Sequence, residues 1–463
     1  MAEPVVIEGF APVHMIGIGG AGMSALAKIL LARDLPVTGS DIKESPALAG
    51  LRALGARIAI GHDAANLAEP GSVVVSTAIR EHNPELVAAR TRGVPVLHRA
   101  QLLALLMRGR RGIAVSGTHG KTTTTSMIAS ILQRAGLDPG FVIGGDLNER
   151  GTNAHDGAGA WFVAEADESD ASLLWLAPQI AVVTNIEADH LDHYRDEAEI
   201  RATFLAFLDG VEPDGLVVLG AEDPGARAVA ASITRRTVTV GLAEGDWRAE
   251  KTGTSGWREV DVFRRNERLG SMRLGIPGAH NVRNALAALA VADAVGVPFD
   301  DAAETLAVYQ GVQRRLQRRG TAAQVDLLDD YAHHPTEVRA TLDAVREGAP
   351  GRVIAVFQPH LYSRTRFFAS GLGAALAAAD QVVVTDVYGA REEPEPGVTG
   401  KLVVDGVLAA SPRARVAYLP RRGDVPAFVV SRARPGDTIV TIGAGDVTML
   451  GDEILRLLQE RAT

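Results

Sequence analysis

A glycine turn with a single lysine is the part of this sequence that most plainly suggests chemistry. Residues Gly112–Leu132 read GIAVSGTHGKTTTTSMIASIL, an apolar strand followed by a turn and a threonine-rich helix. Small residues let successive backbone N–H groups turn toward an anion, and the positive end of the helix faces the same anion. The turn departs from the usual phosphate-loop pattern, because Val115 stands where that pattern has its first glycine.

The residue types in this turn indicate a nucleoside triphosphate with magnesium. The Lys121 ammonium can reach between phosphate oxygens as a point charge, and as a turn residue it is expected to be exposed. Thr122 is placed to bind a magnesium ion that bridges two phosphates. The predicted ATP-binding residues of the turn are Gly117, Thr118, His119, Gly120, Lys121, Thr122 and Thr123.

A second glycine turn lies near the N-terminus. A strand over Pro12–Ile18 runs into Gly17–Gly22, which satisfies G-x-G-x-x-G, and a helix over Met23–Ala32 follows. Asp41 ends the next strand, about where an acid that binds ribose belongs. The pattern specifies a diphosphate at a helix N-terminus, so a nicotinamide dinucleotide and a nucleotide-sugar diphosphate both fit it.

Two polar runs follow strands that the sequence places in the same sheet as the phosphate turn. EADESD begins at Glu165 after a strand over Trp161–Ala164, and NIEADHLDHY begins at Asn185 after a strand over Ile180–Thr184. Carboxylates next to a triphosphate would repel it unless divalent cations intervene. Glu165 and His190 are therefore candidate metal ligands, and Thr122 would hold another cation.

The elements that position these residues alternate between strands and helices in three stretches. The length of 463 residues suits about three domains. We expect an α/β protein with domains at residues 1–108, 109–313 and 314–463, each built on a mainly parallel, doubly wound sheet. The first and third would be Rossmann-like and the central one similar to P-loop ATPases. A turn-rich β insertion is expected over Trp247–Leu274.

The composition narrows the class of protein. Hydrophobic residues make up 46% and charged residues 22%, as in ordinary soluble proteins. The formal net charge of −9 argues against nucleic acid as a partner, and no apolar run approaches the ~20 residues of a membrane span. The absence of cysteine excludes thiol catalysis. Because MAEPVVIEGF lacks the features of a signal peptide, we expect a cytoplasmic protein.

Nine motifs, in order along nearly the whole chain, resemble the Mur ligases. They are GIGGAGMS, GTHGKTTTTSM, EADESDAS, NIEADHLDHY, HNVRNALAA, GVQRR, DDYAHHPTE, FQPHLYSRT and DVYGAREEP. The resemblance is strongest to the branch that adds L-alanine. It implies a three-domain, ATP-dependent ligase of peptidoglycan precursor synthesis, a monomer or homodimer, that uses UDP-N-acetylmuramate, L-alanine, ATP and two Mg²⁺ ions.

The resemblance also assigns roles to matching residues. Those expected to bind the UDP substrate are Gly19, Gly20, Ser24 and Asp41. Further ATP contacts are expected from Asn281, Asn284, Arg315 and Asp330. The incoming amino acid would meet Tyr331, His333 and Arg364. The expected catalytic residues are Lys121, Glu165, His190, His333 and Arg364, with His333 as a candidate proton acceptor.

Three departures from the family and three alternatives accompany this hypothesis. No lysine lies between Lys121 and Lys251, so the carbamylated lysine of sibling ligases is not expected. Leu361 and Leu316 stand where some relatives carry an arginine and an aromatic residue. The alternatives are a recycling ligase that adds a tripeptide to UDP-N-acetylmuramate, a dehydrogenase, and a non-catalytic nucleotide switch.

Overall fold

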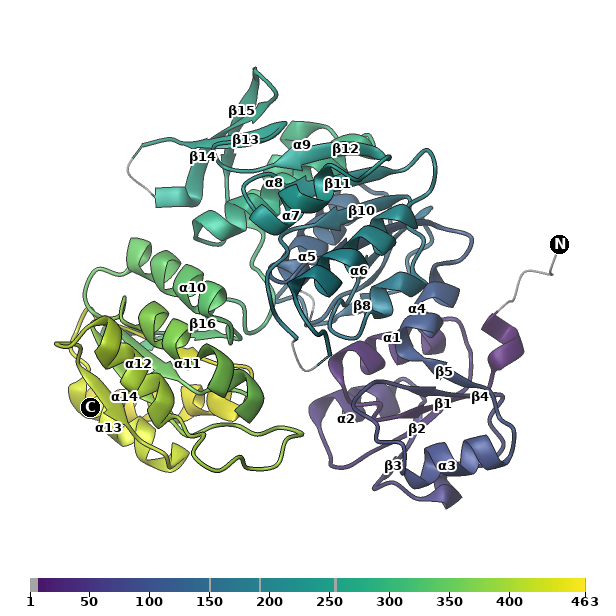
Figure 1. Ribbon diagram of the computed structural model, residues 1–463, viewed down its shortest axis with the longest axis horizontal. Helices are drawn as coiled ribbons and strands as arrows, with labels where there is room; N and C mark the ends of the chain where they lie inside the picture. Colours follow the sequence, from purple (N-terminus) through teal and green to yellow (C-terminus); the bar gives the residue numbers. More distant parts are fainter. Residues whose placement is uncertain (1–6, 150, 191–192, 254–255, 463) are drawn as a thin grey trace. The chain divides into compact units, whose positions relative to one another are not determined.

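A five-stranded parallel sheet forms the N-terminal part of the computed structural model, which describes residues 7–149, 151–190, 193–253 and 256–462 (Figure 1). Its strand order is β3-β2-β1-β4-β5. The strands are β1 (Val13–Ile16), β2 (Val37–Asp41), β3 (Arg57–Ile60), β4 (Ser72–Val75) and β5 (Val96–His98). Strand β1 is buried at all four residues, as expected for the middle of a sheet with both faces covered.

The helices of this part begin where local chemistry predicts. They are α1 (Ala21–Ala32), α2 (Pro46–Ala53), α3 (Pro84–Thr91) and α4 (Arg99–Met107). Ser45 and Asn83 cap α2 and α3 by accepting backbone N–H groups, and a proline follows each cap. The expected Rossmann-like sheet is confirmed, with strand boundaries within two residues of those predicted.

The central sheet contains ten strands in the order β15-β14-β13-β12-β11-β10-β6-β9-β7-β8. They are β6 (Arg111–Ser116), β7 (Gly140–Val142), β8 (Ala154–His155), β9 (Trp161–Glu165), β10 (Ile180–Val183), β11 (Leu216–Gly220), β12 (Arg236–Val240), β13 (Trp247–Lys251), β14 (Glu259–Arg264) and β15 (Glu267–Arg273). Strand β6 pairs in parallel with β9 on one side and β10 on the other. The phosphate turn and both polar runs therefore leave the sheet at one edge.

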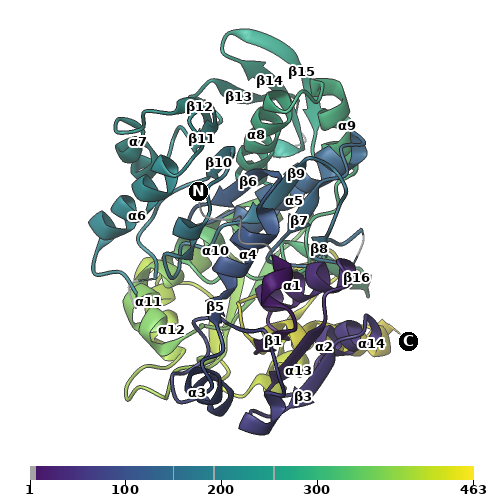
Figure 2. The same cartoon turned by 90° about the vertical axis from the view of Figure 1, so that its right-hand side faces the viewer.

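The helices around the central sheet are α5 (Lys121–Arg134), α6 (Glu197–Asp209), α7 (Pro224–Ala230), α8 (Ala279–Ala294) and α9 (Phe299–Val308). Strands β13 to β15 confirm the expected β insertion and lie at the end of the sheet (Figure 2). Strands β7, β8 and β12 were not predicted. Strands β7 and β8 are only three and two residues long, too short to show a periodic pattern.

The C-terminal sheet has six strands in the order β16-β17-β21-β18-β19-β20. They are β16 (Gln317–Ala322), β17 (Val325–Asp330), β18 (Val353–Phe357), β19 (Gln381–Val384), β20 (Val416–Tyr418) and β21 (Thr438–Ile442). All pair in parallel except β16, which is antiparallel to β17. Strand β16, with sequence QRRGTA, was not predicted because it is a largely polar edge strand.

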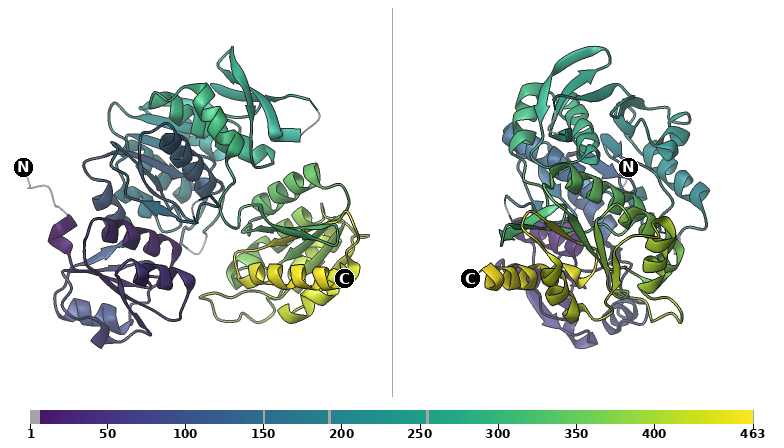
Figure 3. Two further views of the ribbon diagram at one scale, coloured as in Figure 1. Left: turned by 180° about the vertical axis from the view of Figure 1, so that it is seen from behind. Right: turned by 90° about the vertical axis from the view of Figure 1, so that its left-hand side faces the viewer.

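Two helical layers cover this C-terminal sheet. Helices α10 (Pro335–Gly348), α11 (Tyr362–Leu376) and α12 (Lys401–Ala410) pack on one apolar cluster, and α13 (Val425–Arg432) and α14 (Leu450–Ala462) pack on another. Figure 3 shows α14 in yellow beside the strands. The doubly wound α/β architecture is thus confirmed for this sheet as well.

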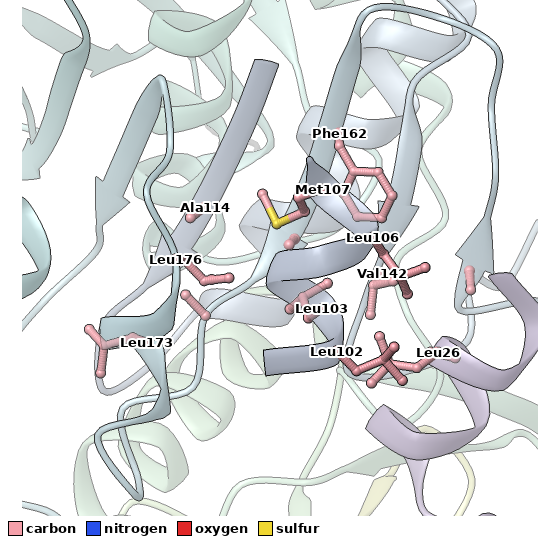
Figure 4. Close-up of a cluster of buried hydrophobic side chains, with 14 of the residues drawn as sticks. Leu26, Leu102, Leu103, Leu106, Met107, Ala114, Val142, Phe162, Leu173 and Leu176 are labelled. Carbon is pink, nitrogen blue, oxygen red and sulfur yellow. The ribbon is translucent and has the colours of Figure 1, made fainter. Parts of the chain in front are cut away.

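The described chain divides into two compact units. One holds residues up to 249, 262–270 and 283–306, and the other holds residues 250–261, 271–282 and those from 307 onward. In the first unit, one apolar cluster joins helices α1 and α4 to the central sheet (Figure 4). Of the helices that the structure describes, none is both long and apolar enough to cross a bilayer.

Candidate active site

The predicted phosphate turn connects β6 to α5 at the carboxyl end of the central sheet. Gly117 has φ +124° and Gly120, the N-cap of α5, has φ +83°. A Cβ on Gly117 would lie 2.2 Å from Thr184 Oγ1, and one on Gly120 would lie 2.5 Å from Asn284 Oδ1. Both positions therefore require glycine. Because no side chain caps α5, its first-turn N–H groups are left for an anion.

The end of β10 shapes this turn. Thr118 N donates to Asn185 O at 3.0 Å, and His119 N donates to Asn185 Oδ1 at 2.8 Å. The hydroxyl of Thr118 in turn accepts from Glu187 N at 2.9 Å. Asn185 was missed as a functional residue, although it opens the second polar run. Its role depends on β10 lying beside β6, which the sequence pattern alone did not specify.

The other predicted ATP-binding residues lie in helices α5 and α8. Thr122 and Thr123 are each 6% exposed in the first turn of α5. Asn284 borders the phosphate turn at Gly120, whereas Asn281 Nδ2 donates to Pro277 O at 2.7 Å. The structure therefore brings Asn284 to the turn and shows Asn281 bonded to the backbone just before its own helix.

Lys121 is not the exposed turn lysine that the sequence suggested, since its side chain is only 14% exposed. Its Nζ donates to Gly117 O at 2.7 Å, to Thr118 O at 3.1 Å and to Glu168 Oε1 at 2.7 Å. Burial lowers the pKa of Lys121, but the carboxylates of Glu168, Asp167 and Glu165 outweigh that effect and raise it. The ammonium is therefore charged and held against the turn.

Glu168 is a site residue that sequence reasoning missed. The residue is 2% exposed, and its Oε1 lies 2.7 Å from Lys121 Nζ and 3.5 Å from His190 Nε2. Its Oε2 is buried and has no hydrogen-bond partner among the described atoms. A buried carboxylate oxygen without a partner, between a cation and an imidazole, is suited to bind a further cation. The acidic run EADESD includes Glu168, but nothing in the local sequence distinguishes it from the neighbouring carboxylates.

Of the two predicted metal ligands, Glu165 is the last residue of β9, and His190 lies in the loop that follows β10. Glu165 Oε2 accepts from Gly144 N at 2.9 Å. His190, at φ +54°, faces Glu168 at 3.5 Å and Asp189 at 3.7 Å. Burial lowers the pKa of His190, but Glu168 and Asp189 raise it overall. The carboxylates thus already stabilise positive charge at this imidazole.

The N-terminal glycine turn connects β1 to α1 in the same unit. Gly17 has φ +74°, and Gly20 is the N-cap of α1 without a side-chain cap. Gly19 N donates to Asp41 Oδ2 at 2.8 Å, and Ser24 Oγ donates to Ala21 O at 3.1 Å. The predicted UDP-binding residues thus come together, with Asp41 ordering the backbone of the turn.

In the C-terminal unit, the residues predicted for nucleotide and amino acid surround Tyr331. The guanidinium of Arg315 lies 5.1 Å from the centre of the Tyr331 ring, and the His333 ring meets that ring edge-on at 5.4 Å. Asp330 accepts from Leu316 N at 2.7 Å and from Ala332 N at 2.8 Å. Burial raises the pKa of Asp330 to about 6, against the opposing effect of Arg315. Asp330 therefore organises the loop that carries Arg315.

His360 is a third residue that the sequence analysis did not assign. Its ring meets the His333 ring at 6.0 Å and stacks on Tyr388 at 5.9 Å, and its buried Nδ1 has no partner among the described atoms. Burial lowers the pKa of His360 to about 3, and nearby His333, Arg364 and Arg391 add to that effect. A neutral imidazole thus lies among arginines, including the predicted Arg364, where a carboxylate would be stabilised.

The two leucines that depart from the family pattern both have backbone roles. Leu316 has φ +48° and donates its N–H to Asp330, as described above. Leu361 has φ +66°, is 5% exposed, and donates its N–H to Tyr388 O at 3.0 Å. Their apolar side chains provide no charge for a ligand.

Three family models match the chain in succession. The one described as Mur ligase family, catalytic domain, matches residues 12–111. Mur ligase middle domain matches residues 115–292, and Mur ligase, glutamate ligase domain, matches residues 314–445. Together these matches cover most of the chain.

Individual proteins match over nearly the full length. The UDP-N-acetylmuramate–L-alanine ligase of Acidothermus cellulolyticus is 49% identical over 470 residues, covering 99% of this chain and 97% of that protein. The crystal structure of a UDP-N-acetylmuramate–alanine ligase from Thermotoga maritima gives a TM-score of 0.83 at 30% identity, covering 97% of this chain and 99% of that one. A murein peptide ligase from Psychrobacter arcticus gives a TM-score of 0.73 at 26% identity, covering 96% and 98%.

Proposed function

This chain belongs to the Mur ligase family, and we propose that it is the ATP-dependent ligase that joins L-alanine to the lactyl carboxylate of UDP-N-acetylmuramate. In this proposal residues 1–108 bind the UDP substrate, residues 109–313 bind ATP, and residues 314–463 bind the amino acid. The reaction would supply a precursor of peptidoglycan.

The observation that carries the proposal is the pair of glycine turns in one compact unit. Each turn precedes a helix whose N-terminus has no side-chain cap, and each lies at the carboxyl end of a parallel strand. Two anion sites of this kind suit a triphosphate and a nucleotide-sugar diphosphate. A dehydrogenase would need only the first turn and would leave Lys121 and the buried Glu168 without a role.

The chemistry starts from an unreactive carboxylate. Transfer of the γ-phosphoryl group of ATP to the lactyl carboxylate gives an acyl phosphate and ADP. The neutral amine of L-alanine then attacks the acyl carbon, and the tetrahedral intermediate expels phosphate. Two anions must approach each other in the first step, so Lys121 and the N-terminus of α5 would stabilise the transferring group.

Magnesium fits the residues at this site. Thr122 would hold one Mg²⁺ at the nucleotide phosphates, and Glu165 and His190 would hold a second, with Glu168 Oε1 3.5 Å from His190 Nε2. The buried Glu168 Oε2 without a partner supports a cation here. The ions would supply positive charge that neutralises the phosphate and carboxylate groups. No lysine lies between Lys121 and Lys251, so this scheme uses no carbamylated lysine.

The amino-acid site would lie around Tyr331 and His333. His333 Nδ1 lies 3.1 Å from Tyr331 O, a contact that favours a proton on Nδ1 and a lone pair on Nε2. His333 therefore suits the role of proton acceptor from the alanine ammonium. Arg364 would stabilise the alanine carboxylate.

Phosphate release from ATP in the presence of UDP-N-acetylmuramate tests this proposal. We expect release with L-alanine to exceed release with the L-alanyl-containing tripeptide, glycine or L-serine. Faster release with the tripeptide would identify the recycling ligase instead. No release with any acceptor, together with thermal stabilisation by NAD(H), would support the dehydrogenase alternative.

A further inference from the structure

Two basic residues face the acidic run after β9. His98 is the last residue of strand β5, and Arg99 is the first residue of helix α4. Arg99 Nη2 donates to Asp167 Oδ2 at 2.6 Å, and His98 Nε2 lies 3.4 Å from Asp170 Oδ2. The Asp170 side chain is 7% exposed, so this contact is largely closed to solvent. None of these four residues takes part in the steps of the proposed reaction.

Helix α4 packs against both helix α1 and strand β9. Its residues Leu102, Leu103 and Leu106 belong to one buried cluster with Leu26 of α1 and with Phe162 of β9 (Figure 4). A helix packed this way cannot shift relative to either part without exposing apolar surface. Arg99, its first residue, is therefore held at a defined place between α1 and the end of β9.

The Arg99 guanidinium reaches both α1, which follows the first glycine turn, and the acidic run after β9. On one side, Nη1 lies 3.6 Å from where a Cβ would stand on Gly22, in the first turn of α1. On the other side, Asp167 is followed in the chain by Glu168, whose carboxylate pairs with Lys121 of the phosphate turn. The Asp167 carboxylate is itself fixed, because its Oδ1 accepts from Ser169 N at 3.0 Å.

We propose that the Arg99–Asp167 ion pair is a positioning contact that sets the separation of the two anion sites, so that the lactyl carboxylate meets the γ-phosphate of ATP. The inference rests on the proposed function, since it concerns the distance between the two substrates of that reaction. Phosphoryl transfer between two bound anions needs the reacting atoms within about 3–3.5 Å, and a 1 Å misplacement costs roughly 10²-fold in rate.

In this proposal the ion pair affects the rate of phosphoryl transfer and not the affinity for either substrate alone. The N-terminal turn keeps its own N–H groups when Arg99 is removed, and the phosphate turn keeps Lys121. Loss of the pair would leave each binding site and the apolar packing of α4 intact, but it would release the segment after β9 that carries Asp167, so the spacing of the two sites would vary locally.

The test uses the full-length protein with Arg99→Ala, Asp167→Asn and the double variant. Phosphate release with saturating substrates gives kcat, and calorimetry gives the Kd of UDP-N-acetylmuramate and of a non-hydrolysable ATP analogue, each alone. We expect each single variant to lose about tenfold or more in kcat and to keep both Kd values within about threefold. The double variant should be no slower than the slower single variant, because both changes remove one interaction.

A matched control is the ion pair between Arg33, after α1, and Asp156, after β8. Arg33 Nε and Nη2 donate to the two Asp156 oxygens at 2.9 Å each, away from both turns. Arg33→Ala should leave kcat within about twofold of the unmodified protein.

Three results would overturn the proposal. They are an unchanged kcat in either folded variant, a tenfold weaker Kd for UDP-N-acetylmuramate with kcat retained, and an equal loss in Arg33→Ala. Asp167→Asn preserves side-chain shape and carries the test if Arg99→Ala does not fold. Absence of activity in the unmodified protein would instead reject the proposed function itself.

Discussion

Replacing Lys121 with alanine removes two things at once: the cation of the phosphate turn and the partner of the buried Glu168 carboxylate. The Lys121 Nζ–Glu168 Oε1 distance is 2.7 Å, and the Glu168 side chain is 3% exposed. Removing one partner of a buried pair leaves an uncompensated charge, which costs about 3–5 kcal/mol. We therefore expect Lys121→Ala to lower the free energy of unfolding by about 3 kcal/mol.

The double variant Lys121→Ala/Glu168→Gln separates stability from catalysis. A neutral amide removes the uncompensated charge, so most of the lost stability should return. Activity should not return, because the transferring phosphoryl group still lacks the cation, a loss of about 10³-fold. Both single variants and the double variant provide the cycle needed to measure the coupling.

Urea denaturation followed by far-UV circular dichroism measures the stabilities, and phosphate release measures the activities. The reasoning fails if Lys121→Ala is as stable as the unmodified protein, or if the double variant is no more stable than Lys121→Ala. More than about a tenth of normal turnover in either lysine variant would remove Lys121 from the phosphoryl-transfer step.

Three further predictions concern the metal, the first substrate and pH. Glu165→Ala and His190→Ala should each reduce acyl-phosphate formation more than ATP binding, and their losses should be strongly non-additive, since both would act through one ion; losses that multiply in the double variant would reject the shared site. UDP-N-acetylmuramate should raise the thermal midpoint by an amount that grows with its concentration, whereas NAD(H) should not; equal stabilisation by NAD(H) would restore the dehydrogenase alternative. Burial raises the pKa of Glu85, but hydrogen bonds from His14, Asn66 and Ser40 lower it to about 2, from an ordinary 4.5. Because the folded-state pKa is depressed, this carboxylate stabilises the fold above about pH 4.5, and about 2 kcal/mol should be lost between pH 5 and pH 3. Glu85→Gln should flatten that acid-side loss in urea denaturation, and an unchanged pH dependence would contradict the assignment.

Much of the fold could be predicted from the sequence because parallel strands and their helices leave local patterns. Apolar runs such as Ile180–Val183 and Val353–Phe357 are buried at every position, and they were predicted as strands. The glycine turns were also predictable, since Gly117, Gly120 and Gly17 adopt conformations that other residues rarely adopt. The polar edge strand β16 and the very short β7 and β8 were not, because their stability comes from neighbours and not from their own pattern.

The sequence by itself determined the chemistry available to the molecule. It provides two anion-binding turns, the lysine of the second turn, and carboxylates that follow parallel strands. These depend on residues close together in the chain. Only the tertiary structure decided which partners meet: Glu168 with Lys121 and His190, Asn185 with the phosphate turn, Arg99 with Asp167. Long crossovers separate these residues, and strand register and helix packing bring them within hydrogen-bond or ion-pair distance, which no local pattern records.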